Sequence, residues 1–393
     1  MIPRKHAVIL TGHFPVQKRR GSILWLCDNL RASGWHVTMI TVGYSWVSKV
    51  RGDKRFATLD GKPVPGIHDH DETLTSIFGY SPLHPFSLRR PFLDRLARPL
   101  HQSFPAYWRK KLKAPLAKAD LVVIESGQPV MLSPLVRRFA RDAAMVYRVN
   151  DDVNVLGLPA FIGEAELKYA GLFDRISVAS PHLARRFAAY PSVQMDPMGV
   201  SKSLLDQDLP DPFEHRERAE REAVCAGTTQ FDMDAVLSMA RLRPNWNFHI
   251  FGRLRGTPSD IPGNLILHGE MPFLETAAWI KHADIGLAPY LDKPGVEYQT
   301  AHSNRMLMYR YFGLPMIGPK RICDPAVPSL VGYEPGQEVS FVAALDRLDQ
   351  MKRTLADPAI QDWSVLAERI ASTVPAGQAH ARTGHHERAR NIA

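Results

Sequence analysis

Short apolar runs alternate with amphipathic segments along most of the chain. The first run, residues 7–12 (AVILTG), predicts a buried parallel strand, and the next segment, residues 22–33, carries an apolar stripe that predicts a helix. A second strand is predicted over residues 36–42. This β-α-β opening predicts a doubly wound α/β fold, in which ligands bind at the carboxyl ends of the strands.

The alternation continues in two series, which a polar, proline-containing segment separates. We interpret that segment, residues 203–220, as a linker. The prediction is two Rossmann-like, doubly wound domains that face a cleft, residues 1–202 and 221–373, with a loop-rich stretch over 43–80 and a disordered tail over 374–393. Further strands are predicted at residues 120–125, 145–148, 176–179, 223–227, 247–251, 265–267, 285–289 and 315–317, and helices at 126–140, 232–242, 273–282, 306–312 and 339–355.

The composition is typical of a soluble globular chain. Its 393 residues exceed one typical core, and 45% of them are hydrophobic and 23% charged. No apolar run reaches the roughly 18 residues that span a bilayer, and residues 1–10 lack the apolar core and cleavage site of a signal peptide.

The positions of the cysteines and glycines bear on two kinds of cofactor, metals and dinucleotides. Cys27, Cys225 and Cys323 are far apart and odd in number, which indicates reduced thiols, and their spacing is not that of metal ligands. No G-x-G-x-x-G follows the first predicted strand, so a dinucleotide cofactor is not supported. We expect neither a metal nor another cofactor.

The charge is concentrated in the first half. The net charge is +9, but residues 1–202 hold 29 Lys and Arg against 16 Asp and Glu, a net +13, whereas the remaining residues carry −4. An excess of positive charge that is confined to one half indicates that this half binds an anionic partner, either an anionic membrane or nucleic acid.

Residues 84–118 have the most unusual composition. Arginines and lysines interleave with Phe, Tyr, Trp and Leu, and prolines break the segment into short helical pieces. This mixture favours the headgroup region of an anionic membrane. Nucleic acid is a second interpretation, because aromatic rings stack on bases, although no compact nucleic-acid-binding module is recognisable. Packing of the aromatics in the core is the third.

A polar-to-apolar segment over residues 298–319 is the strongest candidate for anion binding. Ser303 or Asn304 can cap a helix that Gly313 ends in the left-handed conformation. The backbone N–H groups at such a helix start, together with the guanidinium of Arg305, form a site suited to a diphosphate.

The other candidate groups follow predicted strands of the first half. Asp151 and Asp152 come directly after a strand, where either carboxylate could accept a proton from a hydroxyl group. His13, Arg19 and Arg20 follow the first strand and are the candidates to contact an acceptor phosphate or sugar. A carboxylate base and a diphosphate site on opposite sides of a cleft are what glycosyl transfer from a nucleotide-sugar requires.

Seven segments carry a family resemblance: RGDKR at 51–55, HPFSLRR at 84–90, IESG at 124–127, VYRVND at 146–151, HGEM at 268–271, IKHADIGLAPY at 280–290 and FGLP at 312–315. Through them, from about Leu10 to Tyr333, the chain resembles the xanthan-type bacterial β-glucuronosyltransferases. Those are inverting enzymes of the GT-B fold that transfer glucuronic acid from UDP-glucuronate to a polyprenyl-diphosphate-linked oligosaccharide.

The resemblance implies a role for individual residues. It places the catalytic aspartate at Asp151. The family has Lys at the position of Arg305, and the change keeps the charge while altering the donor geometry. It has Gln at the position of Met308, and a thioether cannot replace that amide. The UDP contacts that it implies are Thr229, Glu270, Met271, Tyr290, Asn304, Arg305 and Met308.

We therefore expect an inverting, metal-independent glycosyltransferase of exopolysaccharide assembly at the cytoplasmic face of the bacterial inner membrane. The expected partners are a UDP-sugar, a polyprenyl-diphosphate-linked acceptor and an anionic membrane surface, but not nucleic acid. One alternative keeps the fold and uses UDP-glucose or another neutral UDP-hexose. A second alternative is a non-catalytic protein that binds sugar nucleotides.

Overall fold

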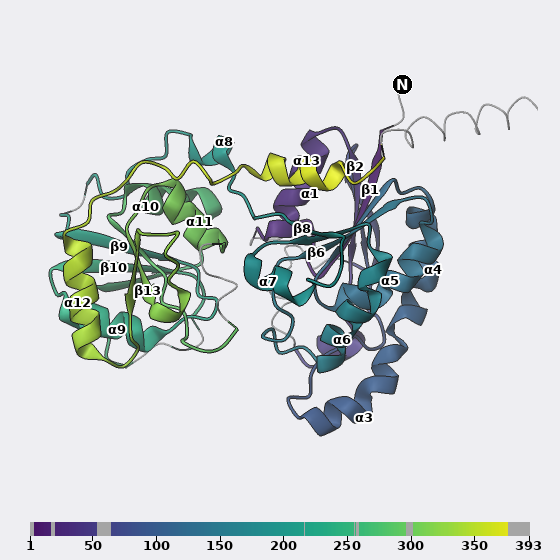
Figure 1. Ribbon diagram of the computed structural model, residues 1–393, viewed down its shortest axis with the longest axis horizontal. Coiled ribbons are helices and arrows are strands. Elements are labelled where there is room, and N and C mark those ends of the chain that lie inside the picture. The colour runs from purple at the N-terminus through teal and green to yellow at the C-terminus, as the bar shows by residue number, and fades with distance from the viewer. Residues whose placement is uncertain are drawn as a thin grey trace, which may run out of the picture. The chain divides into compact units, whose positions relative to one another are not determined.

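The structure is a computed structural model that describes residues 4–16, 20–52, 64–215, 217–254, 256, 259–295 and 302–375. The chain divides into two compact units (Figure 1). Unit 1 comprises Met1–Pro197 together with Trp363–Ala393, and unit 2 comprises Met198–Asp362.

Unit 1 is built on a sheet that has eight strands within the described residues, in the order β3-β4-β2-β1-β5-β6-β7-β8. The strands pair in parallel, apart from the antiparallel β3–β4 hairpin. The central strands are buried along almost their whole length, because helices cover both faces of a parallel sheet. Their bounds are β1 His6–Thr11, β2 His36–Thr41, β3 Gly66–Asp71, β4 Leu74–Phe78, β5 Leu121–Glu125, β6 Ala144–Val149, β7 Arg175–Val178 and β8 Val193–Met195.

The helices of unit 1 come from both ends of the chain. Helix α13 packs against α1, the helix that follows the first strand (Figure 1). The apolar stripe of α1 is buried as predicted, although Gly21 rather than Ser22 is the N-cap. The bounds are α1 Ser22–Ala32, α2 Trp46–Val50, α3 Pro91–Gln102, α4 Phe104–Ala117, η2 Gln128–Leu132, α5 Ser133–Phe139, α6 Ala160–Tyr169, η3 Ala170–Leu172, α7 Pro181–Arg186 and α13 Trp363–Ala371.

Unit 2 repeats the design with a parallel sheet that has six strands within the described residues, in the order β11-β10-β9-β12-β13-β14. Its strands are β9 Arg221–Ala226, β10 Trp246–Phe251, β11 Leu265–Gly269, β12 Ile285–Leu287, β13 Met316–Pro319 and β14 Leu330–Tyr333. Its helices are α8 Lys202–Leu205, α9 Met233–Leu242, α10 Phe273–His282, α11 Asn304–Tyr311, η5 Lys320–Ile322 and α12 Glu338–Asp349.

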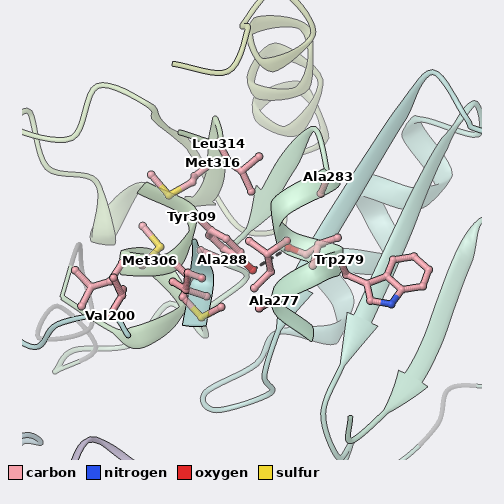
Figure 2. Packing of buried hydrophobic residues seen from close by; sticks show 14 of the residues in the cluster. Val200, Ala277, Trp279, Ala283, Ala288, Met306, Tyr309, Leu314 and Met316 are labelled. Carbon is pink, nitrogen blue, oxygen red and sulfur yellow. Dashed lines mark hydrogen bonds between the residues drawn. The ribbon is translucent and has the colours of Figure 1, made fainter. Parts of the chain in front are cut away.

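Helix α11 is packed in the core of unit 2. Met306 and Tyr309 are fully buried among residues of α10 and β13, such as Ala277 and Met316 (Figure 2). The Tyr309 hydroxyl lies 2.8 Å from the Val224 carbonyl oxygen, which ties the helix to β9. The core thus fixes the start of α11 against the carboxyl end of the central strand.

The predicted doubly wound α/β architecture is confirmed, and the predicted strands are present within one or two residues of their ends. The loop-rich prediction for residues 43–80 is wrong for its described part, because it contains α2, β3 and β4. Strand β3 (GIHDHD) is polar and exposed at the sheet edge, so it lacks an apolar pattern. Helix α12 is also shorter than predicted.

The division between the units differs from the predicted boundaries. Residues 203–220 were predicted as a linker, but Leu205, Leu209 and Phe213 are buried in the apolar core of unit 2. The chain passes between the units at residues 197–198 and returns at 362–363. The predicted disordered tail lies outside the described residues from residue 376 onward.

Gly313 gives a test of the α11 turn. It has φ +68°, and an added Cβ would collide with the Thr354 carbonyl oxygen. Gly336 has φ +74° with no atom near the Cβ position, so it is the matched control. We expect Gly336→Ala to cost about 1 kcal/mol from backbone conformation alone, and Gly313→Ala to cost clearly more. Calorimetric unfolding measures both, and equal costs would contradict the packing described here.

Candidate active site

The topology of unit 1 defines one switch point. Strand β1 lies between β2 and β5, so the connections leaving β1 and β5 diverge at the carboxyl edge. Ligands of doubly wound sheets bind in the crevice at such a point. The polar residues Thr11, Glu125 and Asn150 lie there, at the ends of β1, β5 and β6.

Glu125 links these three strand ends. Its side chain is buried, it accepts a hydrogen bond from the Thr11 hydroxyl, and its Oε1 lies 3.4 Å from the Asn150 side-chain nitrogen. The His13 Nε2 lies 3.8 Å from the same oxygen, with about two-fifths of the His13 side chain exposed (39%). A buried carboxylate needs such partners, and here they hold the edge of the sheet in one arrangement.

Asp151 and Asp152 differ in their surroundings. Asp152 accepts a hydrogen bond from the Asn154 backbone N–H at 3.0 Å, and its carboxylate also lies 3.5 Å from the Arg186 guanidinium and 3.6 Å from His182. Asp152 therefore stabilises its own loop. Asp151 is half-buried and directly follows Asn150 at the switch-point edge.

The buried guanidinium of Arg148 lies next to this edge of the sheet. The Arg148 guanidinium donates to the Asn150 side-chain oxygen at 2.9 Å, to the Ser177 hydroxyl at 2.9 Å and to the Asp196 carbonyl at 2.6 Å. Burial lowers the pKa of Arg148 to about 10, so the group stays charged at neutral pH. Arg148 thus holds the side chain of Asn150, the residue that precedes Asp151.

Unit 2 has an equivalent switch point, between β9 and β12. Arg305, from the first turn of α11, donates from Nε to the Ala226 carbonyl at 3.0 Å and from Nη2 to the Gly227 carbonyl. Its guanidinium carbon lies 4.7 Å from the ring centroid of Tyr290, which follows β12. Three segments distant in sequence thus meet at one edge.

Two polar atoms at this edge lack partners. The Arg305 side chain is buried, and its Nη1 has no hydrogen-bond partner among the residues that the structure describes; the same holds for the Asn304 side-chain oxygen. A buried, unpaired charged donor is costly, so it points to an anionic acceptor that binds there. Ser303 caps the helix, accepting from the Met306 N–H at 3.2 Å.

The remaining predicted donor residues fall into two groups. Thr229, after β9, is exposed, and Glu270, after β11, pairs with Arg253 at 3.2 Å. Both lie at the same edge as Arg305. Met271 and Met308 instead contact the apolar core, where Met308 is buried.

The predicted acceptor residues are not equivalent in the structure. His13 lies at the edge beside Glu125. Arg20 forms an ion pair with Asp28 and lies 5.3 Å from the ring centroid of Trp25, so its side chain is directed along α1. Arg19 lies outside the described residues.

The basic–aromatic segment divides into two different helices. Phe104, Trp108, Leu112 and Leu116 of α4 are buried in unit 1, so the core-packing interpretation holds for these four side chains. Membrane contact through residues 84–118 stays a prediction. In α3 the apolar side chains Phe92, Leu96 and Leu100 are 70%, 62% and 64% exposed.

Two features are absent from the residues that the structure describes. No helix there combines the length and the apolar composition needed to cross a bilayer. No group of three or more His, Cys, Asp or Glu side chains there is arranged to hold a metal ion.

Residues 9–179 match the family model described as "Glucuronosyltransferase GumK, N-terminal domain". The chain is also similar to the UDP-glucuronate:glycolipid 2-beta-glucuronosyltransferase of Xanthomonas campestris pv. campestris, with 28% identity over 369 residues, 94% of this chain and 90% of that protein. The chain is thus similar to the GumK glucuronosyltransferases, through the family model over residues 9–179 and through the relative over nearly its whole length.

Solved structures that are similar to this chain establish the fold class. One is a UDP-forming α,α-trehalose-phosphate synthase from Burkholderia xenovorans in complex with glucose-6-phosphate (TM-score 0.61, 12% identity, 94% of this chain and 99% of that chain). Another is the glycotransferase of kitacinnamycin (TM-score 0.53, 13% identity, 98% of this chain and 99% of that chain). The fold is GT-B, as the resemblance implied.

Glu125 is the residue at the switch point of unit 1 that the sequence analysis missed. Glu125 lies within the IESG segment, but the sequence pattern did not mark it as a functional residue. A usable signal existed, because it is a charged residue that ends an otherwise apolar strand, and the neighbouring strands end at Thr11 and Asn150. The register of the strands, which brings these ends together, was not readable from the sequence.

Proposed function

We propose that this GumK-like glycosyltransferase transfers glucuronic acid from UDP-glucuronate to a sugar of a lipid-linked oligosaccharide, with inversion at the transferred carbon. The name of the Xanthomonas relative supports the donor and the glycolipid acceptor. The observation that carries the proposal is the buried Arg305 guanidinium with its unpaired Nη1 at the unit 2 switch point.

The start of α11 is suited to the diphosphate of the donor. Backbone N–H groups at a helix start and a guanidinium both favour phosphate oxygens. Arg305 is held in place by the Ala226 and Gly227 carbonyls, so it needs little reorganisation when the leaving UDP gains charge. These groups supply the positive charge that the leaving group requires, and we propose that no metal is needed.

Asp151 is proposed as the general base. Its carboxylate takes the proton from an acceptor hydroxyl group as that oxygen forms a bond to the anomeric carbon of the donor sugar. The bond between the anomeric carbon and the diphosphate oxygen breaks in the same displacement, and UDP leaves with the electron pair. One displacement of this kind inverts the configuration. Asn150 and Arg148 hold the base in position.

We also propose that the enzyme acts at the inner face of the bacterial membrane and binds it through α3. Helix α3 stands out from the body of unit 1 (Figure 1). Its exposed Phe92, Leu96 and Leu100 are spaced four residues apart and share one face, and exposed Arg89, Arg90 and Arg95 flank them. An apolar face bordered by cations is complementary to anionic lipid.

The base assignment predicts that Asp151→Asn lowers the rate of transfer roughly 100-fold or more while UDP affinity stays near the wild-type value, because the amide cannot accept the proton. Turnover is measured with a panel of UDP-sugars and membrane lipid extract, which also tests UDP-glucuronate against UDP-glucose. Asp142→Asn, at the amino end of β6, is the control. Turnover of Asp151→Asn within tenfold of wild type would reject Asp151 as the base.

The membrane proposal predicts that the triple variant Phe92→Ser, Leu96→Gln, Leu100→Gln sediments less with phosphatidylglycerol vesicles than the wild type. High salt should weaken wild-type sedimentation, because it screens the arginines. Leu355→Gln is the control, since Leu355 is an exposed leucine (93%) of unit 2. Unchanged sedimentation of the triple variant would count against α3 as the contact.

A further inference from the structure

A cavity of about 530 Å³ in unit 1 has no part in the site described so far. It lies between α2, the loop over residues 84–89 and the loop over residues 156–158, with Gln128 of η2 at its wall. We call it the α2 pocket. Its volume is within the range of small-molecule sites, about 300–1,000 Å³.

The α2 pocket is cationic. Arg51 and Arg89 both line it, and among the described lining residues there is no carboxylate to neutralise them. Arg51 ends α2, and its guanidinium carbon lies 5.8 Å from the ring centroid of Phe86. Arginine pairs well with phosphate through two parallel N–H donors, so this pair of side chains favours a phosphorylated ligand.

Arg89 adopts an uncommon backbone conformation. Its φ is +60°, a region that favours glycine. The conformation is fixed from α3: Asp94 accepts from the Ser87 hydroxyl at 2.7 Å and from the Leu88 N–H at 2.6 Å, and the Ser87 hydroxyl in turn accepts from the Arg89 N–H at 3.0 Å. Strain of this kind is found most often where a side chain must be aimed at a ligand.

The remaining walls of the α2 pocket include both polar and apolar side chains. His84 is buried, and its Nδ1 lies 2.8 Å from the Ser45 hydroxyl at the N-cap of α2. Phe86 and Leu158 provide apolar walls. A ligand that satisfies all of these surfaces carries phosphate and an apolar chain.

The α2 pocket shares its walls with the loops of the active edge. The 156–158 loop continues the segment that begins at Asp151. A Cβ added to Gly127, two residues beyond Glu125, would lie 3.8 Å from the Leu158 side chain. Gln128 donates to the Pro85 carbonyl at 3.4 Å. A ligand in the pocket therefore lies at the same edge of the sheet as the proposed base.

We propose that the α2 pocket binds the phosphate group of the lipid-linked acceptor, with Arg51 and Arg89 as the phosphate contacts and Phe86 and Leu158 against the adjoining chain. The acceptor sugar then extends along the 156–158 loop toward Asp151. This inference rests on the proposed function for the identity of the acceptor, but the binding that it asserts can be measured without transfer.

The test measures binding of farnesyl diphosphate, farnesol and inorganic pyrophosphate to the full chain by calorimetry, for wild type, Arg51→Gln and Arg89→Gly. We expect wild type to prefer farnesyl diphosphate, and each variant to lose about tenfold or more in affinity, the worth of a charge-assisted contact. Arg89→Gly also relieves the positive φ, so its thermal midpoint should not fall. Arg141→Gln, exposed at the amino end of β6, should bind like wild type.

Two results would overturn the proposal. One is equal farnesyl diphosphate affinity in wild type, Arg51→Gln and Arg89→Gly. The other is equal affinity of wild type for inorganic pyrophosphate and farnesyl diphosphate, which would indicate a general anion site. Absence of transfer with intact, arginine-dependent farnesyl diphosphate binding would instead count against the proposed function alone. The two failures are thus distinguishable.

Discussion

The buried guanidinium of Arg305 is the constraint on which unit 2 depends. Its Nε and Nη2 donate to the carbonyls that follow β9, and its Nη1 has no partner among the described residues. A buried cation needs hydrogen-bond acceptors, and the two carbonyls supply them to two of its three nitrogens. The core supports this arrangement, because Tyr309 ties α11 to the same strand.

Unit 1 also has a buried charged group at its switch point, and there the group is a carboxylate. Glu125 is buried at the meeting point of three strand ends, and Arg148 lies below Asn150. These buried polar groups hold the side chain of Asn150, which precedes Asp151, whereas Asp152 stabilises its own loop. Each unit therefore places its polar groups at its own switch point, which is where a doubly wound sheet has room for a ligand.

Much of this organisation could be predicted because buried strands leave a strong apolar pattern. The runs at 120–125 and 145–148 fixed the place of Asp151, and Ser303 to Gly313 indicated α11. Contacts between distant segments were not readable. Three features depend on contacts between elements that are distant in sequence, which the local sequence does not encode. They are the polar edge strand β3, the burial of Trp108 and the packing of α13 in unit 1.

The most direct test of the account is calorimetric binding of UDP to wild type, Arg305→Lys and Arg305→Gln, each first shown to be folded by its thermal midpoint. The account predicts that Arg305→Gln loses about tenfold or more in affinity and that Arg305→Lys, which keeps the charge without the planar fork, lies between the two. A folded Arg305→Gln protein that binds UDP as tightly as wild type would contradict it.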